Sequence, residues 1–173
     1  NTGNWEPPAV IGVCEVENRK VLEILTASGA LKRWRYEVIH KDSPDERGID
    51  VAALYRPDLF MPLSYRYFPP VAEGQPIPHT REILYICGLM AGTDTIHLFY
   101  NHWPSRYSGL METRALRNQA GQRLRQEVVS LTKKHAFPKI IIMGDFNDQP
   151  EDESLAAALG AGNKINGDPG HLV

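Results

Sequence analysis

Asp145 and Asn147 stand two positions apart, directly after the apolar run 139–143 and Gly144. An apolar run of this kind predicts a buried strand, and open α/β sheets bind ligands beyond the ends of such strands. The Asp carboxylate can accept a proton from water, and the Asn amide can orient an oxygen atom. Gly-Asp and Asn-Asp sequences also form Asx turns readily. Alone, this segment allows a catalytic and a structural interpretation.

Two further segments place polar groups after predicted strands. Glu15 stands near the end of the apolar run 9–16, where a carboxylate is costly unless a cation compensates it. It could equally lie in solvent or pair with an Arg. The loop 101–106 reads Asn-His-Trp-Pro-Ser-Arg. Its His102 and Arg106 can donate hydrogen bonds to a phosphoryl oxygen, although a solvated loop around a structural Trp would look the same.

A single sheet edge could gather these three segments, because each follows a strand. Mg²⁺ prefers oxygen ligands and commonly takes one or two carboxylates plus substrate phosphate, and Glu15 supplies such a carboxylate. His102 and Arg106 would neutralise charge on phosphoryl oxygens. Asp145 would aim a water molecule, with Asn147 fixing its geometry. Together these are the parts that metal-assisted hydrolysis of a phosphate ester requires.

The elements that must position these residues follow from the apolar pattern. Strands are expected at 9–16, 36–40, 49–55, 59–68, 83–89, 95–100 and 139–143, the fifth and sixth forming a hairpin. Helices are expected at 17–25, 112–135 and, in a short form, 154–159. Several strands follow one another between helices, which favours mixed sheets packed face to face with helices outside. No repeat or linker interrupts 1–173, so we predict one α/β domain.

Side-chain patterns indicate what each of these elements buries. The first helix would bury Val21, Leu22 and Leu25 on one face. Cys14 and Cys87 lie in strand-like apolar runs and are predicted to be buried free thiols rather than a disulfide.

Bulk composition excludes some classes of protein. Of the 173 residues, 42% are hydrophobic and 23% charged, as in ordinary globular domains. The net charge of −2 argues against a general polyanion binder of the histone kind. No apolar run approaches the roughly 18 residues that a membrane span needs. No targeting segment is visible, and the sequence leaves the compartment and the oligomeric state open.

Five segments in order resemble the endonuclease/exonuclease/phosphatase superfamily, which has the DNase I-like fold. They are I-G-V-C-E-V-E-N around Glu15, R-G-I-D-V-A-A-L-Y-R-P from Arg47, T-R-E-I-L from Thr80, N-H-W-P-S-R from Asn101 and I-I-M-G-D-F-N-D-Q-P from Ile141. They cover most of the chain, from about Pro8 to Leu155.

The resemblance implies a four-layer sandwich of two mixed sheets with outer helices. It also implies a phosphoesterase that depends on Mg²⁺ or Mn²⁺ and acts on nucleic acid or another phosphorylated substrate. By motif match, Glu15 binds the metal, His102 stabilises the phosphoryl charge, and Asp145 and Asn147 orient the nucleophile and the phosphate. The predicted substrate contacts are Arg81, Asn101 and Arg106.

Two parts of the family pattern do not match this sequence. The family normally begins with an Asn-bearing strand well before the metal-binding Glu, and ends with a Ser-Asp-His motif. We therefore expect a partial domain that is weakly active or inactive by itself. Glu17 stands where DNase I-like endonucleases often carry an Arg, and an acidic side chain beside a phosphate backbone disfavours reading of a DNA groove.

Other classes remain as alternatives. The run 144–148 fits the G-D-x-x-D pattern of calcineurin-like phosphoesterases, but the accompanying D-x-H and G-N-H motifs are missing, since Asp94 and His97 are spaced D-x-x-H. A non-catalytic binding module of the same fold is the alternative to an enzyme. The retained residues Glu15, His102, Asp145 and Asn147 argue against it. Loops such as 41–48 and 69–80 would select among nucleic acid, lipid-headgroup and inositol-phosphate substrates.

Overall fold

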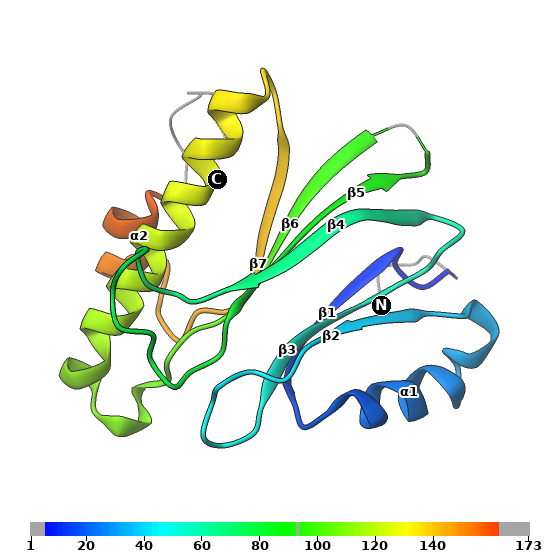
Figure 1. The fold of residues 1–173 in the computed structure, drawn as a ribbon, viewed down its shortest axis with the longest axis horizontal. Coiled ribbons are helices and arrows are strands. Elements are labelled where there is room, and N and C mark those ends of the chain that lie inside the picture. The colour runs from blue at the N-terminus through cyan, green and yellow to red at the C-terminus, as the bar shows by residue number, and fades with distance from the viewer. Residues whose placement is uncertain (1–5, 93, 163–173) are drawn as a thin grey trace.

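A computed structural model describes residues 6–92 and 94–162, so parts of the predicted domain 1–173 lie outside the described residues. The described chain forms two β-sheets with helices on their outer faces (Figure 1). In chain order the elements are β1 (Val10–Val16), α1 (Arg19–Ala27), η1 (Lys32–Trp34), β2 (Glu37–His40), β3 (Asp50–Tyr55), β4 (Phe60–Phe68), β5 (Ile83–Met90), β6 (Asp94–His102), η2 (Arg106–Ser108), α2 (Leu110–Lys134), β7 (Lys139–Asp145) and η3 (Ser154–Leu159). Every predicted strand and helix is present, with small shifts of the ends.

The two sheets differ in strand direction. Sheet A has the order β1-β3-β2 and is antiparallel in the described residues, whereas sheet B has the order β4-β5-β6-β7. In sheet B only the β6–β7 pair is parallel. The long helix α2 joins these two strands, and parallel neighbours need such a crossover. The prediction of two facing sheets is confirmed, and the mixed character belongs to sheet B.

Central strands are buried on both faces, which creates the layers. On β3, Val51 and Ala53 pack toward sheet B, whereas Ala52 and Leu54 pack toward α1. This alternation follows from the two-residue period of a strand.

The outer helices close the remaining layers. α2 packs Ala120, Leu124 and Val128 against the outer face of sheet B, as its apolar spacing predicts. α1 covers sheet A with Leu22 alone, because Val21 and Leu25 are 45% and 44% exposed. The predicted three-residue buried face of α1 is therefore wrong, since sheet A is narrow. Asn18 sets the start of this helix, because its side chain accepts a hydrogen bond from the Val21 N–H at 3.1 Å.

Two of the three strands that carry the predicted site lie at sheet edges in the described residues. β1 borders sheet A and β7 borders sheet B, so both are half exposed rather than buried as predicted. Ile141 of β7 is 45% exposed. Cys14 and Cys87 are free thiols as predicted, and each is half buried rather than buried. In the part of the chain that the structure describes, no helix combines the length and apolarity of a membrane crossing.

Candidate active site

The parallel strands β6 and β7 end side by side and bring two of the predicted segments together. In their register Asn101 lies opposite Gly144, and His102 lies opposite Asp145. Gly144 has a φ of +135°, and a Cβ atom there would overlap the carbonyl oxygen of Asn101. The glycine before Asp145 is therefore what lets these two strand ends approach closely.

The end of β1 reaches the same place from the other sheet. Gly12 makes this possible, because a Cβ there would overlap the ring of Tyr100 on β6. The Cys14 thiol donates to the Asn101 carbonyl at 3.5 Å. The β1–β3 register shifts between Val13 and Val16, and Glu15 has a φ of +58°, which is unusual for a residue other than glycine.

This bulge turns Glu15 toward the end of β6. The Glu15 Oε1 atom lies 4.0 Å from Nε2 of His102. The Glu15 side chain is 68% exposed, whereas that of His102 is 3% exposed. The carboxylate is thus open to solvent beside a buried imidazole. No sequence signal predicts the left-handed backbone at a glutamate.

Burial decides the protonation state of His102. Loss of solvent, and then the positive charge of Arg81, lower the pKa of His102, while Asp145 and Glu15 partly offset this effect. The ring is therefore neutral near pH 7. Its Nδ1 atom is buried without a hydrogen-bond partner in the described residues. A proton at Nδ1 would be an unsatisfied buried donor, so the neutral ring carries its proton on Nε2, which faces Glu15.

Asp145 and Asn147 form the Asx turn that the sequence offered as the structural interpretation. Oδ1 of Asp145 accepts the Asn147 N–H at 2.9 Å, and Asn147 has a φ of +54°. The Asp145 side chain is nevertheless exposed, and its second oxygen is not used by the turn. The Asn147 Nδ2 atom donates to the Trp103 carbonyl at 3.0 Å. The turn therefore holds both side chains while leaving polar atoms of each for a ligand. We call Glu15, His102, Asp145 and Asn147 the open cluster.

Asn101 is placed as a support for these loops. It is fully buried, its Oδ1 accepts the Trp103 indole N–H at 3.1 Å, and its Nδ2 donates to the Met143 carbonyl at 3.2 Å. These bonds use the amide inside the protein. Its predicted contact with substrate receives no support from this position.

Arg81 is also buried next to the open cluster. Its Nη1 donates to Oδ2 of Asp45 at 2.7 Å, and its Nη2 donates to the Trp103 carbonyl at 2.7 Å. The Arg81 and Asp45 side chains are 4% and 5% exposed. Both terminal nitrogens of the predicted phosphate-contacting Arg thus bind protein groups.

Arg106 joins the backbone of the open cluster to a second set of charges. Its Nε donates to the Asn147 carbonyl at 2.8 Å, and its Nη2 donates to Oδ1 of Asp148 at 2.8 Å. The Asp148 carboxylate also pairs with Nε of Arg117 at 2.8 Å. We call this set the closed network; its members are Arg106, Arg117, Asp148, Asp152 and Ser154.

The closed network contains residues that sequence reasoning did not single out. The Asp148 and Arg117 side chains are 4% and 1% exposed. A pocket of about 180 Å³ adjoins the network, and most of the residues that line it are charged groups already paired with one another. Asp148 stands in the motif segment that begins at Ile141. Its partner Arg117 lies 31 positions earlier, so no short sequence pattern could have indicated this ion pair.

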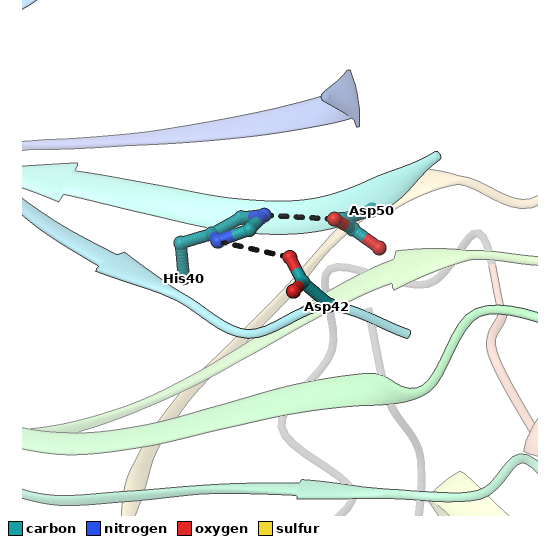
Figure 2. A group of neighbouring side chains, drawn as sticks. All are labelled: His40, Asp42 and Asp50. Atoms are coloured by element: carbon teal, nitrogen blue, oxygen red, sulfur yellow. Dashed lines mark hydrogen bonds and ion pairs between the residues drawn. The ribbon is translucent and has the colours of Figure 1, made fainter. Parts of the chain in front are cut away.

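A further group of possible metal ligands lies at the same end of the strands of sheet A as Glu15. His40, Asp42 and Asp50 each offer a ligand atom within 4.8 Å of the others (Figure 2). Asp50 pairs with Val16 in the sheet. The two ring nitrogens face different carboxylates, with Nε2 at 2.8 Å from Asp50 and Nδ1 at 3.9 Å from Asp42 (Figure 2). An ion held by one ring nitrogen and both Asp residues would have to replace at least one of these two contacts.

Residues 1–170 match the profile described as the Endonuclease/Exonuclease/phosphatase family. The chain belongs to this family. The family consists of metal-dependent phosphoesterases, so the open cluster lies in a protein of hydrolase lineage. No curated protein matches the chain in a sequence search.

Solved structures of other proteins share the fold. The human Nocturnin catalytic domain with bound sulfate aligns with a TM-score of 0.68 at 17% identity, over 87% of this chain and 56% of that one. An endonuclease/exonuclease/phosphatase family protein from Bacteroides thetaiotaomicron aligns with a TM-score of 0.65 at 17% identity, over 87% of this chain and 52% of that one. ANGEL2, described as a 2′,3′-cyclic phosphatase, aligns with a TM-score of 0.66 at 15% identity, over 86% of this chain and 42% of that one. The predicted DNase I-like architecture is confirmed, and the chain spans about half the length of these structures.

Proposed function

We propose that this chain is a metal-dependent phosphoesterase whose reaction takes place at the open cluster. The observation that carries the proposal is the convergence of Glu15, His102 and Asp145 from three strand ends, two of them on one sheet and one on the other. An exposed carboxylate beside a buried neutral imidazole suits the binding of a cation and a phosphate together.

The donor set fits Mg²⁺ or Mn²⁺. Glu15 offers a solvent-exposed carboxylate, which suits a cation that keeps several waters and completes its shell with phosphate oxygens. Glu15 would hold the ion, and the bound ion would polarise the phosphoryl oxygens and offset their charge. His40, Asp42 and Asp50 are the competing location for such an ion.

The remaining members of the open cluster supply proton transfer and orientation. In hydrolysis a water oxygen forms a bond to phosphorus as the ester oxygen leaves. Asp145 would take the proton of that water through the oxygen that the Asx turn leaves open. His102, neutral and protonated at Nε2, would donate to a phosphoryl oxygen. Asn147 would orient the phosphate with the amide N–H that is not bound to Trp103.

The three residues predicted to contact substrate, Asn101, Arg106 and Arg81, have different roles in this proposal. Asn101 fixes Trp103 and the end of β7 from inside the protein. Arg106 fixes the chain after Asn147. The charge of Arg81 acts directly on His102. The substrate would be a phosphate ester, with nucleic acid among the candidates.

An assay of the 173-residue chain tests the proposal. A panel of a dinucleotide, a chromogenic phosphodiester and a phosphomonoester is incubated with Mg²⁺, Mn²⁺ or EDTA. We expect slow turnover that requires metal and that disappears in Asp145→Asn, since the chain covers only about half of its structural relatives. Turnover that persists in EDTA or in Asp145→Asn would reject the proposal. Absence of both turnover and metal-dependent thermal stabilisation would favour a non-catalytic binding module.

A further inference from the structure

The Trp103 carbonyl joins a buried ion pair to a member of the open cluster. This single oxygen accepts from Nη2 of Arg81 at 2.7 Å and from Nδ2 of Asn147 at 3.0 Å. The other terminal nitrogen of Arg81 binds Asp45 at 2.7 Å. A displacement of Arg81 would therefore move the acceptor on which the Asn147 amide depends.

Asp45 is built into its loop from several sides. Its Oδ1 accepts the Arg47 N–H at 3.0 Å, which leaves Oδ2 for Arg81. Its own N–H donates to Oγ of Ser43 at 3.3 Å. Asp45 has a lowered pKa, with hydrogen bonds and charge from Arg81 and Arg47 outweighing the opposing effect of burial. The carboxylate is thus ionised and fixed opposite Arg81.

The base of this loop is anchored on sheet A by the group in Figure 2. Oδ1 of Asp50 accepts the Ser43 N–H at 2.8 Å, and Oδ2 of Asp50 lies 2.8 Å from Nε2 of His40. Ser43 also donates to the Ile49 carbonyl at 3.1 Å. The chain of contacts therefore runs from β2 and β3 through Asp45 to the loop after β6.

We propose that Asp45 and Arg81 are positioning residues that set the orientation of the Asn147 side-chain amide through the Trp103 carbonyl. This inference rests on the proposed function for its kinetic consequences, but not for its structural ones. The Asp45 and Arg81 side chains are buried, so they would act on the Asn147 amide through the Trp103 carbonyl and not by contact with substrate. It also gives the loop 41–48, which the sequence suggested as a determinant of substrate choice, a fixed connection to the open cluster.

The test compares Asp45→Asn with Glu46→Gln. Glu46 is the exposed neighbour of Asp45, and the described hydrogen bonds of Arg81 go to Asp45 and the Trp103 carbonyl, so Glu46 is the matched control. The Asn147 side-chain NH₂ resonance is followed by NMR in the metal-free chain and assigned by its loss in Asn147→Ser. We expect the resonance to move in Asp45→Asn and to stay in Glu46→Gln. With a substrate that is turned over, kcat should fall by about 10²-fold in Asp45→Asn with little change in KM.

Arg81→Lys provides a second variant in case Asp45→Asn does not fold. Lysine keeps the charge opposite Asp45 but has one ammonium in place of the fork that spans two acceptors. We expect the same movement of the Asn147 resonance. An unmoved resonance in these variants, with a raised KM in Arg81→Lys, would overturn the inference and make Arg81 a direct substrate contact. If no substrate is turned over, the proposed function fails while the NMR result still decides the positioning role.

Discussion

The open cluster and the closed network meet in the chain after β7, where Asn147 belongs to the first and Asp148 to the second, and both contain aspartate side chains. They differ in how completely those side chains are paired. In the closed network the Asp148 carboxylate binds Arg106, Arg117 and Ser154. In the open cluster the Asp145 carboxylate accepts one backbone N–H in its own turn. Full pairing fixes a loop, whereas incomplete pairing leaves atoms that can bind a ligand.

The largest expected effect is on catalysis at the open cluster. Asp145→Asn should lower kcat by roughly 10³-fold, because the carboxylate that takes a proton from water is lost. The free energy of unfolding should change by less than about 0.5 kcal/mol, since the side chain is exposed. Steady-state kinetics and urea unfolding of the same preparation measure both quantities. Wild-type kcat in the variant would remove Asp145 from the mechanism.

The converse variant lies three positions later. Asp148→Asn should lower the free energy of unfolding by about 3 kcal/mol, because it removes the negative charge beside buried Arg117. The midpoint of urea unfolding gives this value. Leu131→Val, a small change in partly buried apolar packing on the same helix as Arg117, serves as a reference for ordinary loss of contacts. A stability equal to the wild type would show that the closed network does not hold this loop.

Arg106 contacts both regions, so a variant at this position distinguishes a role in stability from a role in substrate binding. Arg106→Lys should cost about 1 kcal/mol of stability, because lysine cannot bind the Asn147 carbonyl and Asp148 together. KM should stay within the error of the measurement. A raised KM at unchanged stability would restore the role in substrate binding that the sequence suggested for Arg106.

The smallest expected effect concerns pH. The pKa of His102 is lowered in the folded protein, so the unfolded chain binds more protons as the pH falls below about 6.5. Stability should be constant well above that pH, should be lost as the pH falls from about 6.5 toward the folded pKa, and should level off below it. His102→Gln should flatten this dependence, whereas the exposed His79 replaced by Gln should leave it unchanged. Thermal unfolding between pH 5 and 8 checks the slopes, and equal slopes in all three proteins would contradict burial of a neutral His102.

The sequence predicts the elements better than their places in the sheets. Apolar runs identify β1 and β7 correctly, but local patterns do not reveal that both strands lie at sheet edges in the described residues. The edge position of β7 leaves Ile141 45% exposed. Strand ends predict that the three site segments converge. The partners of Arg81 and Arg106 escape prediction, because Asp45 and Asp148 lie 36 and 42 positions away and an Arg beside a predicted site suits a phosphate equally well.

The location of the metal is the central claim, and paramagnetic NMR tests it most directly. Mn²⁺ added in small amounts to the ¹⁵N-labelled chain broadens the amide signals nearest to it. We expect broadening centred on Glu15, His102 and Asp145, and its loss in Glu15→Gln. Broadening centred on His40, Asp42 and Asp50 that survives Glu15→Gln would contradict the account.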